Sequence, residues 1–168
     1  DDLFDLASHF DVAVAHAPVR RSPTATSKLE NYEVDGVPES FPEFNTGVLL
    51  FNENHKVEEM LMNWLSIYES YREGAERPIH DQPAFRKAMY DSDLRIATLS
   101  PEYNFRFIFP GYLEDRVKVL HGRSESLGKM AEVLNRREGR RVFVPGIGVI
   151  HSRNMLVRAI RNIRSLVS

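Results

Sequence analysis

The sequence predicts an α/β fold with a mixed sheet, and two observations support this prediction. Short apolar runs, typical of buried strands, alternate with longer segments whose apolar residues recur every three or four positions. Strands that alternate with helices in this way are characteristic of α/β domains. The length of 168 residues and the hydrophobic content of 42% are ordinary for a globular domain that buries a core.

The first half of the chain is expected to contain two strands separated by a long polar loop. Residues 1–10 should begin a short helix with acidic residues in its first turn, and the apolar run 11–17 should form a buried strand. Residues 20–42 contain several proline and glycine breakers and are predicted to be a loop. Residues 44–52 are the strongest strand prediction.

The rest of the chain alternates between the two element types. Helices are predicted at 57–68 (ended by Gly74), at 80–90 (with Pro83 in the first turn), at 126–137 and, as a basic amphipathic helix, at 154–167; strands are predicted at 94–99, 117–120 and 142–150, the last interrupted by a turn. We expect residues 1–124 to form the main part of the domain. Residues 125–168 would be an extension packed on it.

Composition excludes several classes of function. The net charge of -2 and the pI near 6.3 give no bulk attraction to nucleic acid. The absence of cysteine excludes a disulfide framework, a thiolate nucleophile and a cysteine metal site, and it fits a cytoplasmic location. The basic helix at 154–167 suggests membrane contact, but docking of its apolar face on the domain is the commoner arrangement and is preferred.

Asn45, Thr46 and Gly47 lie where the strongest predicted strand begins. An amide both donates and accepts hydrogen bonds, and a glycine lets a ligand approach the backbone, so the group suits the hydroxyls of a sugar. The structural alternative is a turn asparagine, which is favoured for this motif alone.

Asp81 and Gln82 begin the helix predicted at 80–90. Side by side, a carboxylate and an amide suit two hydroxyls of one sugar ring. The alternative is simple capping of the helix by Asp81, which is again favoured for the motif alone.

His121, Gly122 and Arg123 follow an apolar strand, and ligands of α/β sheets gather beyond the carboxyl ends of strands. A neutral imidazole is a ligand for Mn²⁺, and an arginine forks onto phosphate oxygens. A hydrogen-bonded loop histidine is the alternative. His151, which follows a later strand, is a weaker candidate ligand, and a capping or core role is preferred for it.

The order of these pieces carries more information than any one of them. Asp-Asp-Leu-Phe-Asp, Phe-Asn-Thr-Gly-Val, Asp-Gln, Tyr-Asn and Lys-Val-Leu-His-Gly-Arg follow one another along residues 1–123. This series resembles the glycogenin-like and galactosyltransferase-like enzymes of the GT-A fold, glycosyltransferase family 8 and its neighbours. The resemblance implies the C-terminal half of a GT-A fold, with a mixed sheet and C-terminal helices.

The resemblance also implies roles for individual residues. The expected catalytic pair beside the anomeric carbon is Asp81 and Gln82, and the expected metal ligand, for Mn²⁺ or Mg²⁺, is His121. The expected contacts to substrate are Asn45, Thr46, Gly47, Asn104, Gly122 and Arg123. Asn104 matches a loop asparagine near the acceptor.

Two departures from the family pattern accompany this resemblance. The Asp-x-Asp motif and the nucleotide-binding half, which precede the segment matching residues 1–5, are not in the sequence, so we expect a fragment that is inactive alone. A longer His-x-x-Gly-x-x-Lys pattern is also common in the family, and only His121, Gly122 and Arg123 stand here.

The sequence is compatible with three functions. The first is a hexosyltransferase that uses a nucleotide-sugar donor, UDP-linked in the simplest case, and a carbohydrate, protein or lipid acceptor, with retention of configuration. The second is a non-catalytic carbohydrate-binding or scaffold domain derived from that fold. The third and weakest is a metal hydrolase built on His80, Asp81 and His121.

Overall fold

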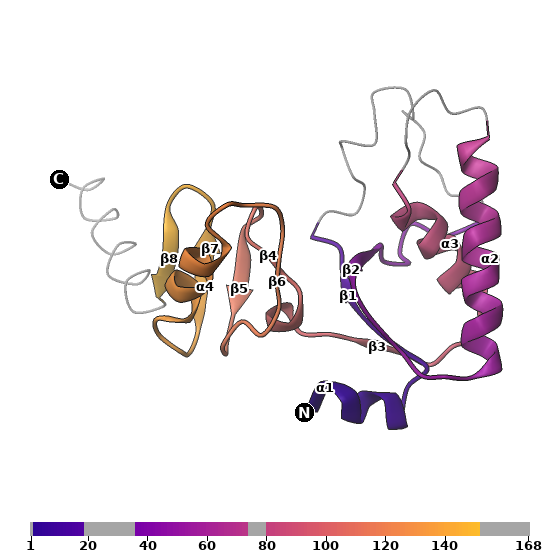
Figure 1. The fold of residues 1–168 in the computed structure, drawn as a ribbon, viewed down its shortest axis with the longest axis horizontal. Helices are drawn as coiled ribbons and strands as arrows, with labels where there is room; N and C mark the ends of the chain where they lie inside the picture. Colours follow the sequence, from indigo (N-terminus) through magenta and orange to yellow (C-terminus); the bar gives the residue numbers. More distant parts are fainter. Residues whose placement is uncertain (1, 19–35, 74–79, 152–168) are drawn as a thin grey trace, which may run out of the picture. The chain divides into compact units, whose positions relative to one another are not determined.

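The computed structural model describes residues 2–18, 36–73 and 80–151. The chain forms two compact units, Asp1–Leu99 and Ser100–Ser168, and each is considered by itself (Figure 1). The predicted division lies elsewhere, between residues 124 and 125. Residues 100–124 belong with the following chain because Leu113 and Val117 share a buried apolar cluster with Leu134 and Phe143.

The first unit is built on a three-stranded mixed sheet in the order β2-β1-β3. The central strand β1 (Val12–His16) pairs antiparallel with β2 (Phe44–Phe51) and parallel with β3 (Ile96–Thr98). The prediction of an α/β fold with a mixed sheet is therefore confirmed at this level, with three small sheets and four α-helices in the part of the chain that the structure describes.

Helices α2 (His55–Arg72) and α3 (Gln82–Asp91) complete the first unit and confirm the helices predicted at 57–68 and 80–90. Helix α3 contacts both α2 and β2 (Figure 1). The predicted opening helix is shorter than expected, since α1 (Asp2–Asp5) continues as a 3-10 turn, η1 (Leu6–Ser8). One cluster of buried side chains joins the sheet to the two helices: Val12, Val14, Phe44, Val57, Met60, Phe85, Ala88 and Met89.

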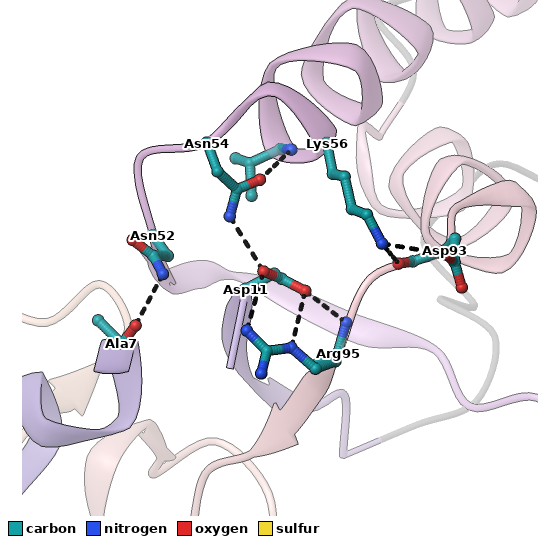
Figure 2. A network of polar contacts seen from close by, with 8 residues as sticks. Ala7, Asp11, Asn52, Asn54, Lys56, Asp93 and Arg95 are labelled. Atoms are coloured by element: carbon teal, nitrogen blue, oxygen red, sulfur yellow. Dashed lines mark hydrogen bonds and ion pairs between the residues drawn. The ribbon is translucent and has the colours of Figure 1, made fainter. Parts of the chain in front are cut away.

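A buried carboxylate, that of Asp11, connects the beginnings of three elements in the first unit (Figure 2). Its Oδ2 accepts a hydrogen bond from the Arg95 backbone N–H at 2.8 Å, just before β3. Its Oδ1 accepts from Nδ2 of Asn54 at 3.0 Å, and Oδ1 of Asn54 accepts from the Val57 N–H at 3.1 Å, which caps α2. These hydrogen bonds, led by that from the Arg95 backbone, hold the pKa of Asp11 below its ordinary value.

Replacing Asp11 should therefore destabilise the first unit. We expect Asp11→Ala to lower the free energy of unfolding by about 1–3 kcal/mol, because the backbone N–H of Arg95 and the amide of Asn54 lose their acceptor. Because the pKa of Asp11 is depressed in the folded state, its contribution is present at neutral pH and lost as pH falls through that pKa. Urea denaturation at pH 7 and pH 3 measures both effects.

The matched control is Asp93→Ala. Asp93 accepts from Nζ of Lys56 at 3.0 Å, but both side chains are exposed, so its removal should cost under about 1 kcal/mol. Equal losses in the two variants would contradict the role given to Asp11.

The described part of the second unit, residues 100–151, contains short strands, one 3-10 turn and one helix. In chain order they are η2 (Pro101–Tyr103), β4 (Phe105–Arg106), β5 (Gly111–Leu113), β6 (Leu120–His121), α4 (Leu127–Asn135), β7 (Arg141–Val144) and β8 (Gly148–His151). Strands β4 and β6 pair in parallel, and β5, β7 and β8 form a separate antiparallel sheet in the order β5-β7-β8. The helix predicted at 126–137 and the interrupted strand predicted at 142–150 are confirmed.

A buried arginine anchors the second unit. The side chain of Arg141 is 1% exposed, and its guanidinium donates to the carbonyls of Leu134 at 3.0 Å, Gly139 at 2.8 Å and Asp115 at 2.6 Å. These three hydrogen bonds to carbonyl oxygens offset the free-energy cost of burying the charged guanidinium.

The strand predicted at 117–120 is only partly formed. The backbone of Val117 bonds instead to the side chain of Asn135, whose Oδ1 accepts at 2.8 Å and whose Nδ2 donates at 3.0 Å. The backbone N–H groups of Lys118 and Val119 donate to the carbonyl of Glu102. Pairing with β4 therefore begins only at Leu120.

Two predicted elements lie outside the described residues. These are the basic helix at 154–167 and most of the polar loop at 20–42. Among the helices that the structure does describe, none combines the length and the apolar character needed to cross a bilayer.

Candidate functional site

Asn45 shapes a bulge in β2. The pairing of β1 with β2 shifts after Val14, so that three residues of β2, Thr46 to Val48, have no partner. Asn45 is 3% exposed, and its Oδ1 accepts from the Gly47 N–H at 3.0 Å, which closes the bulge, while Gly47 itself is exposed. The amide that we expect to read a sugar hydroxyl thus also fixes the backbone around Gly47.

Asp81 and Gln82 lie at the start of α3, close to the same end of β2. Gln82 Nε2 donates at 3.2 Å to the carbonyl of Phe44. The side chain of Asp81 makes no capping hydrogen bond, although its carbonyl accepts from Nε1 of Trp64 at 3.2 Å. The structural alternative of capping by Asp81 is therefore not realised, and the half-buried carboxylate is not engaged by the helix.

Glu43 and Arg86, which the sequence analysis did not select, join this cluster. Glu43 is 6% exposed, and Arg86, at 8%, donates to the carbonyls of Pro38 and Phe41. The carbonyl of Glu43 accepts from Ala17, which continues the pairing of β1 with β2 by one step. Desolvation raises the pKa of Glu43 to about 7, against the opposing charge of Arg86.

The raised pKa of Glu43 predicts a pH-dependent stability. Its folded pKa of about 7 lies above the ordinary 4.5, so ionisation opposes folding, and stability falls as pH rises from about 4.5 through 7. We expect Glu43→Gln to remove this slope and to stabilise the protein by about 2 kcal/mol at pH 8. Thermal unfolding at pH 5 and pH 8 measures the difference.

Glu39→Gln is the matched control, because Glu39 is exposed. It should leave the difference in stability between pH 5 and pH 8 unchanged. A decrease in stability at pH 8 for Glu43→Gln would contradict the burial of an ionised carboxylate.

His121 and Asn104, 17 residues apart, are brought into contact in the second unit. Nδ1 of His121 lies 2.9 Å from Oδ1 of Asn104, whose side chain is buried. Since an amide oxygen only accepts, Nδ1 carries the proton, and Nε2 keeps its lone pair. A histidine fixed in this tautomer by a second side chain is the arrangement found at metal ligands.

The charge state of His121 is set by its surroundings. Desolvation, and secondly the charge of Arg106, lower the pKa of His121 below its ordinary 6.5. Arg106 lies directly opposite His121 in the parallel pairing of β4 with β6. The imidazole is therefore neutral at pH 7, as a metal ligand must be.

The tautomer of His121 can be observed directly. In long-range ¹H–¹⁵N correlation spectra of the metal-free chain at pH 7.5, His121 should show a protonated Nδ1 and an unprotonated Nε2. Asn104→Leu removes the acceptor and should give a mixture of the two tautomers. The exposed His55 provides an internal control that the substitution should not change. A protonated Nε2 in the unsubstituted chain would contradict this assignment.

Gly122 and Arg123 follow His121 with different degrees of constraint. Gly122 has a φ of 153°, and a Cβ at this position would lie 2.5 Å from Cε1 of Phe107. The need for glycine here thus arises from packing against a core ring as well as from backbone geometry. Arg123 is exposed.

The predicted site residues divide between the two units. The first unit holds Asn45, Thr46, Gly47, Asp81 and Gln82, and the second holds Asn104, His121, Gly122 and Arg123.

Within residues 2–18, 36–73 and 80–151, no three histidine, aspartate or glutamate side chains gather so as to hold a metal ion. His80 is exposed, and His151 is the last residue of β8. His121 is therefore a candidate metal ligand that belongs to no such group of three among the described residues.

Comparisons of the chain with protein-family models, with curated proteins and with solved structures gave no match. The function is therefore argued from the residues and their geometry.

Besides Arg86, two polar residues of these clusters were missed by the sequence analysis, Glu43 and Arg106. Each lies two positions from a residue that was selected: Glu43 from Asn45, and Arg106 from Asn104. In an extended chain, residues two positions apart lie on the same face. This alternation could have identified Glu43 as a neighbour of Asn45. Burial and loss of hydration, which make both residues unusual, are not visible in a sequence.

Proposed function

We propose that this chain is the sugar-facing half of a glycosyltransferase of the glycogenin-like GT-A type. It would transfer a hexose from a nucleotide-diphosphate sugar, UDP-linked in the simplest case, to a carbohydrate, protein or lipid acceptor, with retention and with Mn²⁺ or Mg²⁺. A cytoplasmic location, which the cysteine-free sequence favours, is part of the proposal.

The contact between Asn104 and His121 is the observation that carries the proposal. The resemblance implies that both residues belong to the site, and they form a hydrogen bond at 2.9 Å despite their separation in sequence. The hydrogen bond leaves Nε2 of a neutral imidazole available as a ligand.

The first unit would act on the sugar. Asp81 has a carboxylate that does not cap α3, and we assign it to stabilise positive charge that develops at the anomeric carbon. Gln82 Nε2 donates to the backbone, which fixes the orientation of its amide, and its Oε1 would accept from a sugar hydroxyl. Asn45 fixes the backbone around Gly47, and its place in the sugar site is what the resemblance implies. Glu43 lies two residues before Asn45, at the same end of β2.

The second unit would act on the leaving group. A divalent metal, when bound, neutralises charge on the departing diphosphate. Among the described residues, His121 would hold this metal, and Arg123 would donate to the phosphate oxygens. Because Arg106 places a positive charge beside His121, we expect little affinity for the metal alone and stronger binding when the negative diphosphate accompanies it.

The same arginine favours a second candidate function. A cation beside His121 opposes metal binding, which suits a carbohydrate-binding or scaffold domain that has no metal chemistry. Calorimetry with a sugar ligand separates the two, since such a domain would bind equally well with and without Mn²⁺ and UDP.

The test uses the full-length protein that contains this chain. Release of UDP from UDP-glucose and UDP-galactose should require Mn²⁺, and His121→Ala or Asp81→Asn should each reduce the rate on the order of 100-fold or more, since each removes a group that stabilises charge in the transition state. A coupled UDP assay measures this.

His55→Ala is the control, because His55 is an exposed residue of α2 that lies outside the proposed site. It should keep the full rate. Metal-independent release of UDP, or an unchanged rate in His121→Ala, would contradict the proposal.

A further inference from the structure

Arg106 carries a buried donor that no protein group satisfies. Its Nε is the only buried side-chain nitrogen or oxygen, among the residues that the structure describes, without a hydrogen-bond partner. Leaving such a group unpaired destabilises the folded chain, and more strongly when the group is charged. Unsatisfied buried donors in native proteins call for a specific explanation, and an absent ligand is one.

The charge of Arg106 is also uncompensated. The described ion pairs of the second unit join Arg116 to Glu138 and Arg140 to Glu114, and neither includes Arg106. The one buried carboxylate described in this unit, that of Glu102, accepts from two backbone N–H groups, those of Glu114 and Asp115. No described acidic group therefore neutralises Arg106.

Two neighbours determine where Arg106 lies. The guanidinium carbon is 5.2 Å from the centroid of the Phe109 ring, which covers one face of the guanidinium. In the parallel β4–β6 pair, Arg106 is in register with His121, which Asn104 holds by its hydrogen bond. A planar set of N–H donors is thus placed beside an oriented imidazole.

We propose that the guanidinium of Arg106, beside His121, forms a binding site for a phosphate-type oxyanion, in which Nε–H of Arg106 donates to an anion oxygen. The guanidinium matches phosphate geometry and is more weakly hydrated than an ammonium, so it is suited to a partly desolvated position. The identification of this anion as the diphosphate of the donor rests on the proposed function; the anion site itself does not.

The experiment follows the Nε–H resonance of Arg106 in ¹H–¹⁵N spectra of the complete chain. Sodium pyrophosphate and UDP are titrated in separate arms, without metal and at constant ionic strength. We expect the Arg106 Nε–H signal to shift in a saturable manner in both arms. Arg106→Gln should weaken pyrophosphate binding about tenfold or more, and Arg106→Lys, which keeps the charge but loses the planar donors, should recover only part of it.

Arg116→Gln is the matched control, since Arg116 is an exposed arginine of the same unit, whose Nε lies 4.0 Å from Oε1 of Glu138. It should retain the affinity for pyrophosphate. Equal weakening in Arg106→Gln and Arg116→Gln, or a Nε–H signal that does not move, would overturn the proposed site. If Arg106→Gln does not fold, Arg106→Lys together with the Nε–H signal of the unsubstituted chain decides the matter.

The two proposals fail separately. Pyrophosphate binding through Arg106 in a protein that releases no UDP would leave the anion site standing and contradict the glycosyltransferase. Metal-dependent sugar transfer that is unchanged in Arg106→Gln, with no pyrophosphate shift, would do the reverse.

Discussion

The buried carboxylate of Asp11 is the constraint on which the arrangement of the first unit depends. Strand β1 is central in its sheet, and the carboxylate at its start binds both the backbone that enters β3 and the asparagine that caps α2. Elements more than 80 residues apart in the chain are thereby fixed at one end of the sheet. Asn45 and Gln82 lie at the opposite end of β1, where it pairs with the start of β2. The candidate sugar-facing residues therefore lie at one end of a sheet whose other end is held by Asp11.

Several candidate functional groups have a structural use as well. Asn45 closes the bulge around Gly47, Gln82 binds an edge carbonyl of β2, and Asn104 binds His121. Such dual use orients the side chains, because a hydrogen bond to the fold holds each amide in a defined direction. Glu43 and Arg106 differ from these, since each carries a charge in a position that does not fully compensate it. Residues whose placement lowers the stability of the fold are candidates for a functional role.

The predicted elements with strong periodicity were located correctly. The apolar spacing along α2 and the apolar run of β2 reflect burial of one face, which a sequence records directly. The strand predicted at 117–120 was largely wrong, because the side chain of Asn135 takes the backbone hydrogen bonds that a strand would have used. The two compact units divide after Leu99, whereas the expected division follows residue 124, because Leu113 and Val117 pack against residues that follow them in sequence. Both depend on long-range contacts.

The sequence by itself determined the class of fold, the helices and most strands, and the residue types from which a site would be built, since these follow from local periodicity and side-chain chemistry. Only the tertiary structure decided which groups meet. It joined Asn104 to His121, placed Arg106 in register with that histidine, and left the carboxylate of Asp81 out of the cap of α3. Burial sets the protonation of Glu43 and of His121, and burial is a property of the packed chain.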